Sequence, residues 1–313
     1  MSSPSSTQSP PKLAAWIAAT RPRVFVASFV PMGLAGVVAL RDGVFQPVMF
    51  LLALLGVMAL QTAANLINEY ADHRRGADEL KQAGQSMTLK NRLLSAQEIL
   101  YGAVASLLVG VTIGLFLLWQ SGPALWWIGI GGVLVAITYT AGPFPLAYHG
   151  LGEVAAGIFM GPMIVLGAYY VMDSSISAER GVELALLSFP IMFTTAAILH
   201  ANNLRDLEAD RAANKRTLAV IFGRQVARLE YKVLLGVSYL SQVILILIGW
   251  YPWTTALSLL TIPQALRLVR VFDEQTDPLV LHLAQGATAQ LHGKLGLGIV
   301  VGWLLTLLIQ TIF

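Results

Sequence analysis

The sequence contains no cysteine and little charge. The absence of cysteine excludes disulfide bonds and thiolate metal sites. Only 12% of the 313 residues are charged, whereas soluble domains carry about 25%. The lysines and arginines flank long apolar runs and follow no nucleic-acid-binding pattern, so we expect no nucleic-acid partner. The chain is 56% hydrophobic with a mean hydropathy of +0.68, which indicates a polytopic membrane protein embedded in a lipid bilayer.

Nine apolar segments approach the length of about 20 residues that a helix needs to cross a bilayer. We therefore expect an all-α polytopic membrane protein with nine transmembrane helices. Residues 1–20 are expected to form a disordered or interfacial N-terminal tail, and residues 21–313 a single transmembrane domain. The nine segments are residues 24–40, 48–67, 99–119, 124–141, 154–172, 184–201, 233–250, 253–271 and 295–313.

Basic residues alternate between the loops that join these segments. Of the 20 lysines and arginines, only Arg41 and Arg180 fall on the second side. Because cytoplasmic loops carry the excess of positive charge, the basic side should face the cytoplasm. Two long loops on this side, over residues 72–97 and 206–231, are expected to cover the protein there.

Two polar clusters follow directly after apolar segments on the basic side, in residues 65–78 and 200–217. In the first cluster, Asn65, Asn68 and Asp72 are spaced by three and four residues. An α-helix places side chains with this spacing on one face.

The second cluster repeats the pattern with Asn202, Asp206 and Asp210, each four residues apart. Carboxylates one turn apart repel each other unless a positive charge lies between them. Mg²⁺ prefers oxygen ligands and is often shared between carboxylates and substrate phosphates. Two such faces on one side of the membrane therefore predict Mg²⁺ and a phosphorylated substrate. The bases that would hold the remaining phosphate oxygens are Arg74, Arg75, Arg205, Arg211, Lys215 and Arg216.

A third polar stretch begins at the end of the fourth apolar segment and contains Tyr139, Tyr148 and Glu153 among turn-forming glycines and prolines. The five histidines of the chain show no metal-ligand spacing. We expect His200, at the end of the sixth segment, to contact a ligand.

The paired motifs, Asn68-x3-Asp72 and Asp206-x3-Asp210, resemble those of the UbiA superfamily of membrane aromatic prenyltransferases. The stretches ANLINEYADHRRGAD, TYTAGPFPLAYHGLGE and ANNLRDLEADRAANKRTLAVIFG resemble the branch that prenylates 1,4-dihydroxy-2-naphthoate in menaquinone or phylloquinone synthesis. In that branch the third acid of the first motif stands at the position of Asp78. The resemblance implies a UbiA-type helix bundle with cytoplasmic cap loops. It also implies a multi-pass protein of the bacterial cytoplasmic (inner) membrane whose active site faces the cytoplasm.

The resemblance further implies a Mg²⁺-dependent transfer of a polyprenyl group from a polyprenyl diphosphate to an aromatic acceptor, with loss of the ring carboxylate as CO₂. The implied metal ligands are Asn68, Asp72, Asp78, Asp206 and Asp210. The implied catalytic residues are Asn68, Asp72, Asp206, Asp210, Lys215 and Tyr139. The implied substrate-binding residues are Arg21, Asn65, Arg92, Tyr148, Glu153, His200, Asn202, Asn203 and Arg205.

Alternative functions follow from the same residues. A related enzyme would prenylate 4-hydroxybenzoate, homogentisate, chlorophyllide or haem instead. Acids near membrane helices also mark ion pathways, so the alternative outside this class is a cation-coupled transporter.

Overall fold

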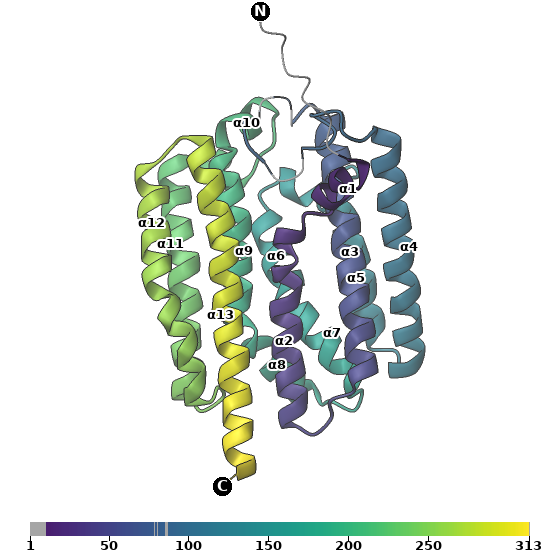
Figure 1. Ribbon diagram of the computed structural model, residues 1–313, viewed down its shortest axis with the longest axis vertical. Coiled ribbons are helices and arrows are strands. Elements are labelled where there is room, and N and C mark those ends of the chain that lie inside the picture. The colour runs from purple at the N-terminus through teal and green to yellow at the C-terminus, as the bar shows by residue number, and fades with distance from the viewer. Residues whose placement is uncertain (1–10, 78, 80, 85–86, 313) are drawn as a thin grey trace, which may run out of the picture.

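A computed structural model describes residues 11–77, 79, 81–84 and 87–312. Residues 1–10 of the expected tail, and Asp78 and Phe313, lie outside the described residues. Within the described part the fold is helical, and its β-pairing is limited to one isolated bridge between His149 and Arg216. The helices, shown in Figure 1, are α1 (Lys12–Thr20), η1 (Pro22–Val24), α2 (Val26–Arg41), α3 (Pro47–Arg74), α4 (Ala96–Ser121), α5 (Leu125–Thr138), η2 (Leu146–Tyr148), α6 (Gly152–Met160), α7 (Pro162–Met172), α8 (Ala178–Leu187), α9 (Phe189–Arg205), α10 (Leu207–Ala212), α11 (Leu218–Leu247), η3 (Trp253–Thr261), α12 (Ile262–Glu274) and α13 (Pro278–Ile312).

Six helical stretches in the described part are long and apolar enough to cross a membrane. They are α3, α4, α6 with α7, α11, η3 with α12, and α13. Two bent pairs, α1–η1 with α2 and α8 with α9, raise the number to eight if each pair is one span. The remaining expected segment corresponds to α5, whose 14 residues extend about 21 Å, short of the roughly 30 Å of hydrocarbon. The chain is thus a multi-pass integral membrane protein with six to eight candidate spans.

Two helices begin earlier than the apolar pattern indicates. Helix α11 starts at Leu218 and α13 at Pro278, so most of the loop expected over residues 206–231 is helical. The Thr217 side chain accepts a hydrogen bond from the Val220 amide at 3.4 Å and thereby caps α11. The polar stretch before residue 295 is helical as well, because tertiary packing overrides its weak apolar character.

The bundle has two lateral groups of helices with a central group between them (Figure 1). Helices α3, α4 and α5 lie on one side, and α11, α12 and α13 on the other. Between them, α9 packs against α6, α11 and α13, while α2 packs against α7 and α13. Helix α10 and the N-terminal helix α1 lie at the same end of the bundle, and α8 lies at the opposite end.

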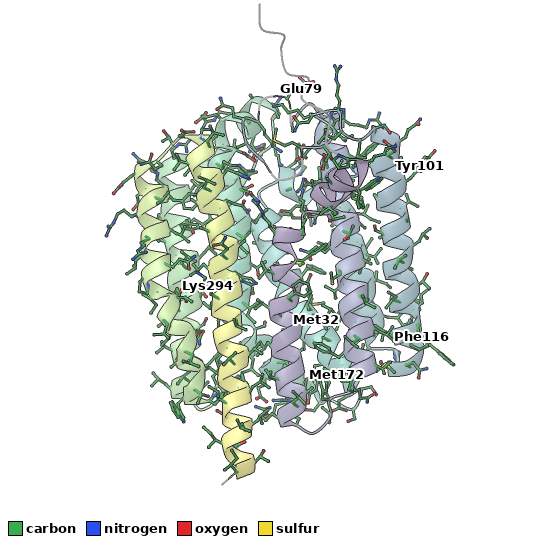
Figure 2. The ribbon with its side chains drawn as sticks, in the orientation of Figure 1. Met32, Glu79, Tyr101, Phe116, Met172 and Lys294 are labelled. Carbon is green, nitrogen blue, oxygen red and sulfur yellow. The ribbon has the colours of Figure 1, made fainter. Side chains whose placement is uncertain are left out.

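The outer surface of the bundle is apolar. Trp127 is 80% exposed and Leu247 79%, which suits contact with lipid tails. Tyr101 and Phe116 project outward from α4 in Figure 2, whereas Met32 is buried within the bundle. A bilayer would therefore remove from water the apolar surface that the helices do not bury against one another.

Glycines let α13 approach η3 closely. A Cβ atom added at Gly302 would lie 2.5 Å from the Thr255 Cα, and one added at Gly298 would lie 2.6 Å from the Ser258 Cα. These are backbone atoms, which cannot move aside as the end of a side chain can. Small residues at membrane helix contacts allow such close packing.

We expect Gly302→Ala to lower the free energy of unfolding by about 1–3 kcal/mol, because the new methyl group overlaps the η3 backbone. Thermal unfolding in detergent, followed by tryptophan fluorescence, measures the change. Gly286→Ala on the same helix is the matched control, because its Cβ would meet no atom within 4 Å. Equal stability of the two variants would contradict this packing.

Candidate active site

A cavity of about 640 Å³ lies among helices α3, α4, α5, α6, α7 and α9. Its polar residues gather where α3 and α9 end, whereas apolar side chains and glycines line the remainder. The polar lining is Arg21, Gln61, Asn65, Asn68, Glu69, Asp72, Lys81, Tyr139, Thr195, Asn202, Asn203, Arg205, Asp206, Asp210 and Lys215.

The last turns of α3 form one wall of the polar end. Asn65, Asn68 and Asp72 all line the cavity, as their helical spacing predicts. The Asn65 amide donates a hydrogen bond to the carbonyl of Thr20 at 3.0 Å, and the Arg21 guanidinium donates to Asn68 Oδ1 at 3.2 Å. The connection between α1 and α2 is thereby fixed against this wall.

Asp72 is 1% exposed and is surrounded by donors from three other segments. The Tyr148 hydroxyl donates to its Oδ1 at 2.9 Å, while Lys215 and Lys81 donate to its Oδ2 at 3.2 and 3.3 Å. A buried carboxylate is tolerated only when it is paired and hydrogen-bonded. These contacts therefore allow Asp72 to stay ionised.

The opposite wall carries the second cluster, but its helix is broken. Helix α9 ends at Arg205, and Asp206 adopts φ −91° and ψ 7° before α10 begins. Arg205 donates two hydrogen bonds to the Asp206 carboxylate, Nε to Oδ1 at 2.7 Å and Nη2 to Oδ2 at 2.6 Å. Asn202, Asp206 and Asp210 nevertheless all line the cavity, so the spacing correctly predicts their common face although the helix does not continue.

Asp210 is buried, and its Oδ1 has no hydrogen-bond partner within the described residues. The Lys215 ammonium lies 3.9 Å from this oxygen. Burial raises the pKa of Asp210 to about 6, and Asp206 adds to this rise while Lys215 opposes it. Although burial alone would lower it, the pKa of Lys215 lies well above its usual value because Asp72 and Asp210 are close. The polar end is therefore a crowded set of oxygens and ammonium groups suited to an ion with multiple charges.

Two residues to which the sequence pattern assigns no role organise this end of the cavity: Lys81 comes from the segment between α3 and α4, and Glu69 comes from α3. Lys81 lines the cavity and pairs with Asp72, and Glu69 holds the segment in place. The Glu69 carboxylate accepts hydrogen bonds from the Thr88 hydroxyl and from the Leu89 amide, the latter at 2.9 Å. Neither contact follows a helical period, so no sequence spacing indicates it.

Four expected substrate-binding residues are not among the described residues that line the cavity: Arg92, Tyr148, Glu153 and His200. Tyr148 lies behind Asp72, and its ring is covered by the cations of Arg75 at 4.7 Å and Lys215 at 5.3 Å. Glu153 and His200 form a buried pair behind the cavity wall. Asn203 connects this pair to the wall, because its amide donates a hydrogen bond to Glu153 Oε1 at 2.7 Å.

Residues 29–284 match the sequence model of the UbiA prenyltransferase family. The chain is similar to the 1,4-dihydroxy-2-naphthoate octaprenyltransferase of Bacillus subtilis, with 31% identity over 92% of this chain and 91% of that protein. It is also similar to the mouse UbiA prenyltransferase domain-containing protein 1, with 34% identity over 94% of this chain and 85% of that protein.

The fold resembles that of a UbiA homolog from Archaeoglobus fulgidus solved with bound GPP and Mg²⁺. The TM-score is 0.63, and the match covers 92% of this chain and 99% of that one. At 14% identity this likeness establishes the helical architecture.

We expect Thr88→Val to lower the free energy of unfolding by about 1–3 kcal/mol, because it leaves the buried Glu69 carboxylate short of one donor. The midpoint of thermal unfolding in detergent measures the loss. Thr311→Val, which alters an exposed hydroxyl near the end of α13, should change stability by less than about 0.5 kcal/mol. An unchanged midpoint for Thr88→Val would show that Glu69 does not anchor this segment.

Proposed function

Because the chain belongs to the UbiA prenyltransferase family, we propose that it transfers a polyprenyl group from a polyprenyl diphosphate to 1,4-dihydroxy-2-naphthoate, in menaquinone or phylloquinone biosynthesis. The name of the Bacillus subtilis relative supports this acceptor. The cavity carries the proposal, because it joins a polar end that suits a diphosphate to an apolar interior that suits an isoprenoid chain.

The polar end fits Mg²⁺ together with a diphosphate. Its acids and amides supply the hard oxygen ligands that Mg²⁺ prefers, and Asp210 Oδ1, which accepts no hydrogen bond within the described residues, offers a further ligand atom. When bound, Mg²⁺ supplies positive charge that offsets the charge of the diphosphate. The residues that would hold it are Asn68, Asp72, Asp206 and Asp210, with Asp78 as a further candidate from the sequence.

The basic side chains assist departure of the diphosphate. Lys215 and Lys81 form ion pairs with Asp72, and Arg205 forms one with Asp206. All three side chains line the polar end of the cavity. As the C1–O bond of the donor breaks, its electron pair leaves with pyrophosphate, and fixed cations stabilise the developing charge. The aromatic carbon then forms a bond to C1 of the allylic cation, and the ring loses its carboxylate as CO₂.

The apolar end shields the cation and the isoprenoid tail from water. Gly114 of α4 and Gly132 of α5 leave open space, because a Cβ atom added at either would meet no atom within 4 Å. Tyr139 lines the wall and can place its ring against the cation. Tyr148 has a different role, because cations already cover its ring: it positions Asp72 through its hydroxyl.

The placement in the membrane follows from the charges. We assign residues 21–313 to one domain with nine spans, in which α5 is a short span that a local thinning of the bilayer accommodates. The end of the bundle that carries α1 and α10 faces the cytoplasm of a bacterial inner membrane, because the lysines and arginines other than Arg41, Arg180 and Lys294, which lies within α13, flank that side in the sequence. Both acid clusters then face the cytoplasm, from which the aromatic acceptor and Mg²⁺ enter.

We expect membranes containing the protein to convert 1,4-dihydroxy-2-naphthoate and a polyprenyl diphosphate to a demethylmenaquinone, with CO₂ released. Chelation by EDTA should stop the reaction and added Mg²⁺ should restore it. Mass spectrometry of the lipid extract measures the product. Product from 4-hydroxybenzoate or homogentisate alone would reassign the acceptor, and no product from any aromatic acceptor would contradict prenyl transfer.

We expect Asp206→Asn to reduce turnover at least ~100-fold, because it removes a charged oxygen from the proposed metal site. Glu208→Gln is the matched control, since Glu208 is exposed, lies two residues away and pairs only with Arg211 and Arg224 among the described residues. This control should retain activity within about twofold of the wild type. Near-normal turnover of Asp206→Asn would remove Asp206 from the site.

A further inference from the structure

A second polar cluster lies behind the cavity wall, where three helices meet. Glu153 comes from α6, His200 from α9 and Glu230 from α11. The His200 Nδ1 atom lies 3.0 Å from Glu153 Oε1 and 3.6 Å from Glu230 Oε2. One potential ligand atom from each residue lies within 4.8 Å of the other two.

The backbone determines which nitrogen of His200 carries hydrogen. Nε2 lies 2.7 Å from the carbonyl oxygen of Ala227, and a carbonyl can only accept. Nε2 must therefore be protonated, which leaves Nδ1 facing two carboxylates. A neutral imidazole would point a lone pair at oxygens that also carry lone pairs, so a cation must lie between them. That cation is either a proton, carried by Nδ1 or by one of the carboxylates, or a metal ion.

An unpartnered oxygen favours the metal ion. Glu153 is 3% exposed, and its Oε2 has no hydrogen-bond partner within the described residues. A proton on Nδ1 satisfies Oε1, which also accepts from Asn203, but leaves Oε2 of the same buried carboxylate without a partner within the described residues. An ion that both oxygens of Glu153 ligate would pair Oε2 as well. Buried carboxylate oxygens are rarely left so, because the lost hydration costs several kcal/mol.

We propose that Glu153, His200 and Glu230 bind a divalent transition-metal ion of the zinc type, at a site separate from the aspartate cluster. Zinc takes histidine nitrogen and carboxylate oxygen ligands at about 2.1 Å, which places ligands of a tetrahedral ion about 3.4 Å apart. The separations of 3.0 and 3.6 Å bracket this value. The imidazole ligand distinguishes the site from one for Mg²⁺, which favours oxygen ligands alone.

The surroundings of the three residues match those of bound metals. Histidine ligands commonly donate their second N–H to a backbone carbonyl, which is the contact that His200 makes to Ala227. Asn203 donates to Glu153 in the same manner and also lines the cavity. The side chain of Glu230 is 24% exposed, so the cluster is not fully closed. The ion would join α6, α9 and α11 and fix Asn203 in the wall.

Metal analysis of the full-length protein in detergent tests the site. The protein is stripped with a chelator, incubated with Zn²⁺ and freed of excess metal. We expect the wild type to retain about one zinc per chain and to unfold at a higher temperature than the stripped protein. Glu230→Gln should lose most of the zinc and the stabilisation. It is the preferred variant because Glu230 is partly exposed, so the substitution is tolerated by the fold.

Two controls separate this site from other carboxylates. Glu208→Gln, on the exposed face of α10, and Asp206→Asn, in the aspartate cluster, should both retain zinc. Retention of zinc by Glu230→Gln and by Glu153→Gln would overturn the proposal, as would loss of zinc only in Asp206→Asn, which would assign the ion to the aspartate cluster. A wild type that binds no zinc would show that a proton, and not a metal ion, lies between His200 and the two glutamates. Because metal content is measured without turnover, these outcomes are independent of prenyl transfer.

Discussion

The buried carboxylate of Asp72 is the constraint on which the polar end of the protein depends. Its oxygens contact Tyr148, Lys215 and Lys81, which lie in three segments far apart in the chain. Removing a carboxylate from water without partners is prohibitively costly, so each segment must adopt the position that brings its donor to Asp72. The connection that carries Lys81, the turn that carries Tyr148 and the connection after α10 are therefore fixed around one side chain.

The apolar part of the cavity depends instead on the absence of side chains at some helix positions. Glycines on α4 and α5, such as Gly114 and Gly132, leave a volume that larger side chains would fill. Elsewhere glycines do the reverse: at Gly298 and Gly302 they let α13 touch the η3 backbone. The same residue type thus produces a cavity on one side of the bundle and a tight seam on the other. Whether a glycine produces a cavity or a close contact depends on whether it faces open space or a neighbouring backbone.

The sequence predicted a helical multi-pass membrane protein and the residues of the two cavity walls, because both are local patterns. The count of nine spans stays a prediction beside the six to eight candidate spans of the described residues. Asn65, Asn68 and Asp72 fall on one face through helical geometry alone, and the family resemblance through these motifs is confirmed. The contacts of Lys81, Tyr148 and Glu69 could not be predicted, because they join segments 9 to 76 residues apart that follow no period. The helix break at Asp206 could not be predicted either, because the residues on both sides of it form helices.

The two polar clusters differ in the ligand atoms that they offer. The aspartates and asparagines at the cavity offer oxygen alone and stand beside lysines, an arrangement suited to exchanging a charged substrate on each turnover. The cluster at His200 is enclosed by three helices, and a backbone carbonyl fixes its imidazole, which suits an ion that stays. Asn203 touches both, because it lines the cavity while donating to Glu153. An ion bound at His200 would therefore hold the Asn203 side chain in the cavity wall without taking part in the reaction.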